Sequence, residues 1–205
     1  TGEFEWTGEY LDDRHLPHDL NPAKGFIATA NGDGVGVTAD GDPFNDDFYI
    51  GYAFNPGHRV ARITELLEER IAAGGVSVDD MKAIQNDAQS PLGRLMTGAV
   101  VAELNRAEEE RNSPGTHDDL TAAVEEVGSA NMAKILTMRD ALAVWTFDTP
   151  AAVEGEPTDA EIADSIAATI FNAAVVRLLR LAFMDELDRA GYSDFTDGWL
   201  FKERL

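Results

Sequence analysis

The sequence predicts an α+β protein that is mostly helical, and three observations support this class. Residues 1–58 are rich in Gly, Asp, Pro and aromatic residues, and their short apolar runs end at turn-forming residues. From Arg59 onward, apolar residues recur at spacings of three and four, which is the repeat of one helix face. A chain of 205 residues that is 44% apolar is also long enough to bury a core. We therefore expect a strand-and-loop segment at residues 1–58 and a helical region at residues 59–205.

The clearest strand candidates in the first segment are the apolar runs GFIATA at residues 25–30 and FYIGYAF at residues 48–54. Asn31 directly follows the first run, so the sequence places its side chain at the edge of a strand. A fixed side-chain amide in such a place can donate a hydrogen bond to an oxygen that becomes negative during acyl transfer. An Asn followed by Gly is also a common turn sequence. The residues alone leave both interpretations open.

The first three predicted helices have recognisable ends. One begins near Arg59 and stops at the glycine pair 74–75. The next begins at Ser77, whose hydroxyl can accept hydrogen bonds from the first-turn amides. A third follows Pro91 and ends where the sequence NSPG at residues 112–115 breaks the chain.

Three more helices are predicted after this break. Two lie at residues 120–127 and 130–145, followed by an acidic connection that contains proline. The last and longest begins at the capping residue Thr158 and runs to about Ala190. One apolar stripe along it is expected to face the other helices: Ile162, Ile166, Ile170, Ala174, Leu178 and Leu181.

The charge balance limits the partners. Sixteen Lys and Arg residues against 38 Asp and Glu residues give a net charge of −22. Such a chain repels nucleic acid and anionic membrane surfaces, so we expect neither as a partner. The most apolar stretch, AATIFNAAVVRLLRLAF, is interrupted by Asn172, Arg177 and Arg180, so it is predicted to be a packed helix rather than a membrane span. The acidic excess with few lysines is typical of halophilic proteins or of an ordinary acidic surface.

Several catalytic classes have no support in the sequence. The chain has no Cys, which removes disulfides, thiolate metal sites and a cysteine nucleophile. It has no G-x-S-x-G motif, and its four His residues are scattered, so a Ser-His-Asp hydrolase is not indicated. His15 and His18 are separated by Leu16-Pro17, which prevents the helix that would bring both rings to one zinc ion.

The acidic stretch NGDGVGVTADGDPFNDD, at residues 31–47, is a candidate calcium-binding loop. Closely spaced oxygen ligands on a flexible backbone suit Ca²⁺, which tolerates irregular coordination. The stretch is not an EF-hand, because Val35 occupies an acidic position of that motif. A solvated loop whose Asp and Gly residues form turns is the alternative, and the composition does not decide between the two.

Five segments in order, LPHDLNPAKGFIATAN, GDPF, HRVARITELLEER, DDMKAIQNDAQS and ATIFNAAVVRLLR, resemble the penicillin amidase (penicillin acylase) family of N-terminal nucleophile hydrolases. The resemblance covers most of the chain and implies an internal segment of the catalytic β chain. It implies the four-layer αββα fold of that family with a helical insertion. It also implies hydrolysis of linear acyl amides by a serine at the N-terminus of the large chain, upstream of this segment, whose own amino group is the base. The remainder of the processed precursor would be the partner, and the location periplasmic or secreted.

The resemblance assigns three residues. The family's oxyanion-hole Asn corresponds to Asn31, and the arginine that supports it corresponds to Arg59. A calcium-ligating Asp lies eleven residues after that Asn in relatives, which corresponds to Asp42, so structural calcium is the expected cofactor. The sequence departs from many relatives by having Gly32 where they have a second Asn.

Two functions from different classes follow. In the first, the segment belongs to an amidohydrolase acting on a small-molecule acyl amide, such as a β-lactam side chain or an acyl-homoserine lactone, and the isolated segment is inactive. In the second, it is a noncatalytic acidic helical module, stabilised by calcium or not, with a structural role only.

Overall fold

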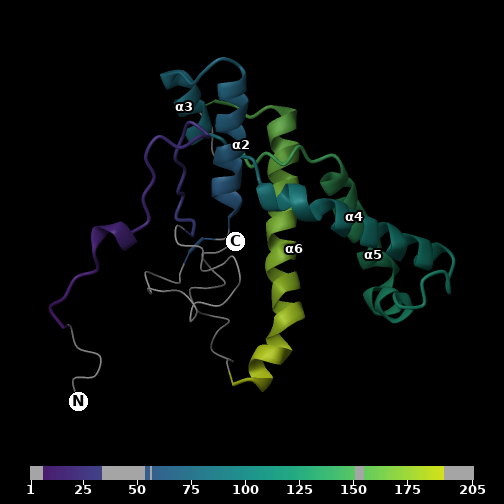
Figure 1. Ribbon diagram of the computed structural model, residues 1–205. Coiled ribbons are helices and arrows are strands. Elements are labelled where there is room, and N and C mark those ends of the chain that lie inside the picture. The colour runs from purple at the N-terminus through teal and green to yellow at the C-terminus, as the bar shows by residue number, and fades with distance from the viewer. Residues whose placement is uncertain (1–6, 34–53, 56, 151–154, 192–205) are drawn as a thin grey trace. The chain divides into compact units, whose positions relative to one another are not determined.

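The computed structural model describes residues 7–33, 54–55, 57–150 and 155–191 (Figure 1). The regular structure of these residues is helical, which confirms the prediction of a mostly helical chain. Two residues, Gln89 and Asp148, form an isolated antiparallel bridge, and no β-strand occurs in the described part. The elements are η1 (Asp13–His15), α2 (His58–Ala72), α3 (Val78–Gln85), α4 (Pro91–Asn112), α5 (Thr121–Ala143) and α6 (Asp159–Arg189).

The chain forms two compact units, Thr1–Ile84 and Gln85–Leu205. The first contains η1, α2 and most of α3, and the second contains α4, α5 and α6. The change in composition near residue 58 coincides with the start of α2, which lies within the first unit.

The strand predicted at residues 25–30 is not formed. Residues 26–29 are neither helical nor paired, and the segment ends in a turn at Ala30 and Asn31. A strand needs the backbone groups of a neighbouring strand as partners, and the described residues supply none beside this segment. The second predicted strand, at residues 48–54, lies outside the described residues except for Phe54. The four-layer αββα arrangement therefore remains an implication of the resemblance.

Helix α2 ends, and helix α3 begins, where the sequence predicts. The N–H of Gly75 donates to the carbonyl of Arg70 at 3.1 Å, and Gly74 and Gly75 have φ of 120° and 130°, which favour glycine. Ser77 then accepts a hydrogen bond from the N–H of Asp80 at 3.1 Å. The hydrogen bonds from Ser77 to the Asp80 carboxylate lower the pKa of that group.

The second unit is a cluster of three helices, in which α4 packs on α5, α5 on α6, and α4 on α6 (Figure 1). Its core is built around Trp145, whose ring lies 5.3 Å from that of Phe171 and whose Nε1–H donates to the carbonyl of Asp148. Gly93 of α4 faces this indole, and a Cβ there would lie 2.6 Å from the ring. Only glycine therefore allows α4 to approach Trp145 this closely.

Helix α6 buries a different face from the one its sequence suggests. Ile162, Ile166, Leu178 and Leu181 are each more than one-third exposed, so the predicted buried stripe is wrong at these positions, whereas Ile170 does pack against the core. The buried residues of α6 are Asp164, Ala167, Ala168, Phe171 and Val175. Apolar residues occupy most sides of this helix, so their spacing alone does not identify the core face, whereas the small Ala167 and Ala168 permit close packing.

Helix α6 is also long and apolar enough, by length and composition alone, to cross a membrane. This is weak evidence, because core helices of soluble proteins can meet the same criteria. In the second unit α6 packs against both α4 and α5.

Candidate functional site around Asn31

Asn31 lies in a tight turn formed by residues 29–32 of the first unit. The N–H of Gly32 donates to the carbonyl of Thr29 at 2.6 Å, which closes the turn. The two central residues, Ala30 and Asn31, have φ of 44° and 58°. Consecutive positive φ values are characteristic of a type I′ turn, in which Asn is favoured and Ala is sterically strained. The alternative interpretation of Asn31 as a turn residue is therefore correct at the level of the backbone.

Two hydrogen bonds attach Asn31 to the chain at the start of α2. The N–H of Asn55 donates to the Asn31 carbonyl at 2.8 Å, and Arg59 Nη1 donates to Asn31 Oδ1 at 3.1 Å. The structure thus brings together two of the three residues that the resemblance assigns. The backbone and the side chain of Asn31 are each fixed by one of these bonds.

The bond from Arg59 determines how the side-chain amide of Asn31 is turned. A guanidinium can only donate hydrogen bonds, so the amide atom facing it must be the oxygen. The amide nitrogen, with two N–H donors, then faces away from Arg59. This is the orientation in which Asn31 can donate to an external oxygen.

Asn31 and Arg59 are exposed in the described structure. A hydrogen-bond donor stabilises a developing negative charge much more strongly where water is excluded. The described residues therefore supply an oriented donor, and not the enclosed environment in which it would be most effective.

The third assigned residue, Asp42, lies outside the described residues, as does most of the acidic stretch at 31–47. Among the residues that the structure describes, no group of three or more His, Asp or Glu side chains could hold a metal ion. In the same part of the chain, His18 Nδ1 lies 2.9 Å from the carbonyl of Leu16. Calcium binding by Asp42 therefore stays a prediction.

A second group of polar residues surrounds Glu110, at the end of α4. This side chain is 1% exposed. Its carboxylate accepts hydrogen bonds from the N–H groups of Gly115 and His117, at 2.9 and 2.7 Å, and from the Thr121 hydroxyl at 2.7 Å. The backbone donors stabilise the charged form and, with Thr121, lower the pKa of Glu110 to about 2.

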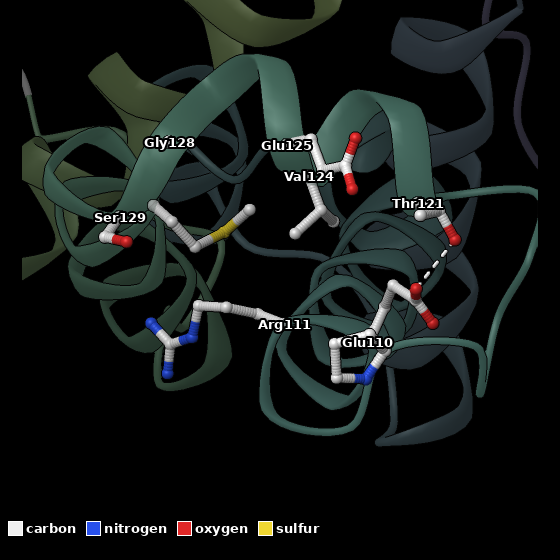
Figure 2. A pocket seen from close by; sticks show the side chains of 9 residues that line it. Glu110, Arg111, Thr121, Val124, Glu125, Gly128 and Ser129 are labelled. Atoms are coloured by element: carbon white, nitrogen blue, oxygen red, sulfur yellow. Dashed lines mark hydrogen bonds between the residues drawn. The ribbon is translucent and has the colours of Figure 1, made fainter.

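The pocket beside Glu110 is small. Figure 2 shows Glu110 and its hydrogen bond to Thr121 at one end, and Arg111 and Ser129 at the other. Its volume of about 210 Å³ is below the range of about 300–1,000 Å³ typical of ligand pockets. The oxygens of Glu110 accept hydrogen bonds from two residues of the loop that joins α4 to α5 and from Thr121 at the start of α5, so this carboxylate holds the loop and has little capacity left for a ligand.

Sequence reasoning did not identify Glu110, although one signal was present. Three consecutive Glu residues, 108–110, lie in the last turns of α4, where the helix dipole opposes negative charge. An acidic residue in that position is favourable when it binds the free N–H groups of the following loop. Asp164, near the start of α6, is a second buried acid, and it accepts hydrogen bonds from the N–H and hydroxyl of Thr146 at 3.1 and 2.7 Å.

Comparison with models of protein families gives a match to the penicillin amidase family over residues 1–204, nearly the whole chain. Comparisons with curated proteins and with solved structures give no match.

Proposed function

Because the chain belongs to the penicillin amidase family, we propose that it is the part of an acylase-like amidohydrolase that supplies the oxyanion donor for hydrolysis of linear acyl amides. The observation that carries this proposal is the hydrogen bond from Arg59 to Asn31 Oδ1. It joins two residues that are 28 positions apart, and it turns the amide nitrogen of Asn31 outward as a donor.

In the proposed reaction a serine hydroxyl, supplied from outside this segment, attacks the carbonyl carbon of the amide. The new C–O bond forms as the carbonyl π electrons move to oxygen, and the hydroxyl proton passes to the serine's own amino group. Asn31 Nδ2 donates a hydrogen bond to the resulting oxyanion. The C–N bond then breaks, and the amine leaves with the proton. Water hydrolyses the acyl ester by the same steps.

Arg59 supports this role through position and charge. Its guanidinium holds the amide oxygen and so prevents the amide from rotating by 180°, which would present an acceptor to the oxyanion. Its positive charge also polarises the amide and makes the N–H groups better donors. Arg59 is a positioning residue, because it acts through Asn31.

The substrate is proposed at the level of class only, as a small-molecule acyl amide such as a β-lactam side chain or an acyl-homoserine lactone. A structural calcium ion with Asp42 as one ligand is part of the same proposal. No step of the proposed reaction depends on that ion.

The second candidate function is a noncatalytic acidic helical module. Two observations favour it: Asn31 is exposed, and the described residues form helices without a sheet. The two functions differ in one measurable respect, because only the first predicts that the complete gene product hydrolyses acyl amides.

The experiment replaces Asn31 with Ala in the complete gene product and measures turnover of chromogenic acyl anilides with acyl chains of increasing length. We expect kcat to fall by about 100-fold or more with KM little changed, the scale for removing one oxyanion donor. Asn21→Ala is a matched control, because Asn21 is also exposed and has a positive φ of 53°. Wild-type turnover in Asn31→Ala would contradict the assignment, and an inactive wild-type protein would favour the noncatalytic module.

A further inference from the structure

We propose that Asn31 and Gly32 form a site of spontaneous deamidation, which converts the proposed oxyanion donor into a carboxylate. The chain has nine Asn residues, and Asn31 is the only one of them that Gly follows. Asn31 is also exposed, so water reaches its side chain. The modification itself does not depend on any activity, whereas its effect on turnover rests on the proposed function of Asn31.

Asn is a thermolabile residue, and its deamidation uses the backbone nitrogen of the residue that follows. The nitrogen of Gly32 attacks Cγ of Asn31, and the new C–N bond closes a cyclic succinimide. The bond from Cγ to Nδ2 then breaks, and ammonia leaves with the proton that the Gly32 N–H gives up. Water opens the ring at either carbonyl and leaves an aspartate or an isoaspartate. Glycine favours the first step because it has no Cβ beside the attacking nitrogen.

The turn at residues 29–32 holds both reacting groups. The N–H of Gly32 donates to the Thr29 carbonyl at 2.6 Å, and Arg59 Nη1 donates to Asn31 Oδ1 at 3.1 Å. The nitrogen must lose the proton that forms the first bond, and rotation of the Asn31 side chain breaks the second. We therefore expect the reaction to follow local opening of this turn and to be slower in the folded chain than in the unfolded chain.

Deamidation reverses the hydrogen-bonding character of this side chain. The carboxylate that it creates is ionised at neutral pH and has only acceptor oxygens. The Arg59 guanidinium can bind these oxygens, but neither of them can donate to an oxyanion. A negative charge beside a developing negative charge also raises the energy of the transition state. Each converted chain therefore loses the donor on which the proposed reaction depends.

Asn112 provides a matched internal control in the second unit. Its side chain is also exposed, and its Oδ1 also accepts hydrogen bonds from a guanidinium, that of Arg111, at 3.2 and 3.3 Å. The residue after it is Ser113, whose Cβ hinders the backbone nitrogen. Asn31 and Asn112 thus share exposure and an arginine partner, and they differ in the residue that follows.

The test incubates the complete gene product at mildly alkaline pH, then digests it and follows each Asn-containing peptide by mass spectrometry with fragmentation. We expect Asn31 to convert before the other Asn residues of this segment, while Asn112 keeps its amide. The same incubation in urea should convert Asn31 severalfold faster, because unfolding releases the turn. An Asn31 amide that outlasts the Asn112 amide, or equal rates with and without urea, would contradict the inference.

Gly32→Asn tests the role of the glycine. Many relatives have Asn at this position, so the turn accepts a side chain there. We expect the Asn31 amide to last severalfold longer than in wild type, because the added Cβ hinders the attacking nitrogen. An unchanged lifetime would contradict the inference. The comparison with Asn112 uses the wild-type chain, so it holds whether or not this variant folds.

Asn31→Asp separates the modification from its effect on catalysis, because it is the direct product of deamidation. We expect kcat to fall by about 100-fold or more, as in Asn31→Ala. Wild-type turnover in Asn31→Asp would show that the proposed function is wrong and would leave the mass-spectrometric result standing. If both Asn31 variants lose turnover while the Asn31 amide stays intact in the incubated wild type, only the inference about deamidation is wrong.

Discussion

Glu110 keeps its negative charge in the interior of the second unit because three donors surround it. Two of them are backbone N–H groups of the loop between α4 and α5, so the carboxylate fixes the path of that loop. Burial by itself would raise the pKa of a carboxyl group. The hydrogen bonds outweigh this effect and hold the pKa of Glu110 below its ordinary value.

This balance predicts a dependence of stability on pH. The pKa of Glu110 is about 2 in the folded chain, against an ordinary value of 4.5. The stabilisation from this group is therefore fully present above about pH 4.5 and is lost as the pH falls towards 2. We expect Glu110→Gln to be less stable than wild type at pH 7, and the difference in urea midpoint to shrink as the pH approaches 2.

Glu126→Gln is the control for this prediction, because Glu126 is an exposed acid on α5. Its urea midpoint should follow that of wild type at every pH. A difference between Glu110→Gln and wild type that stayed constant from pH 7 to pH 2 would show that Glu110 does not act through its charge.

At the candidate site around Asn31, the sequence alone predicts fewer of the contacts than the structure contains. The residues alone are compatible with Asn31 as either a turn residue or an oxyanion donor, and only the resemblance predicts its pairing with Arg59. The positive φ of Ala30 could not be predicted, because alanine disfavours that conformation and is held there by the surrounding contacts. The loop contacts of Glu110 cannot be derived from spacing along the chain either.

At the scale of elements, the start of α6 is specified by its sequence. Thr158 Oγ1 accepts a hydrogen bond from the N–H of Glu161, and the Glu161 carboxylate accepts one from the N–H of Thr158 at 2.7 Å. This reciprocal arrangement is a capping box. It satisfies backbone donors that have no partner within the helix.

We expect Thr158→Ala to lower the free energy of unfolding by about 1 kcal/mol, the usual cost of losing such a cap. Thr169→Ala is the control within the same helix. Thr169 is exposed and its hydroxyl donates to the carbonyl of Ser165, so its replacement by Ala should leave stability unchanged or raise it slightly. Urea denaturation followed by circular dichroism measures both changes. Equal stability of Thr158→Ala and wild type would show that the cap does not contribute.

The helices were predictable because their signals are local. The caps at Ser77 and Thr158 and the stops after α2 and α4 lie within a few residues of the ends they define. Helix α5 has a non-helical residue at Gly128, between the two segments predicted at 120–127 and 130–145. The strand at residues 25–30 and the buried face of α6 depend on what lies beside them in space, which local patterns do not contain.

At the scale of the whole molecule, the net charge of −22 opposes compaction. Many of the few basic residues already form ion pairs in the described part of the chain, as in Arg106–Asp119 and Arg139–Glu108. Acidic residues outnumber basic ones by more than two to one, so most carboxylates repel others without compensation.

We therefore expect the thermal unfolding midpoint to rise as KCl is increased to molar concentration, because the Debye length shortens to about 3 Å at 1 M and repulsion is screened. Differential scanning calorimetry measures this midpoint. Sucrose, which does not screen charge, serves as the control for stabilisation by excluded solutes. A midpoint that did not change with KCl would mean that repulsion among the acidic residues does not lower the stability of the folded chain.

The burial of Trp145 against Gly93 makes this residue useful for fluorescence measurements. The chain has three tryptophans, and of these only Trp145 lies in the described part, where it is 5% exposed between α4 and α6. Once Trp6 and Trp199 are replaced by Phe, the remaining indole becomes an intrinsic fluorophore for this helical cluster. Its emission wavelength would then report the integrity of the second unit, separately from the assays of turnover that follow Asn31.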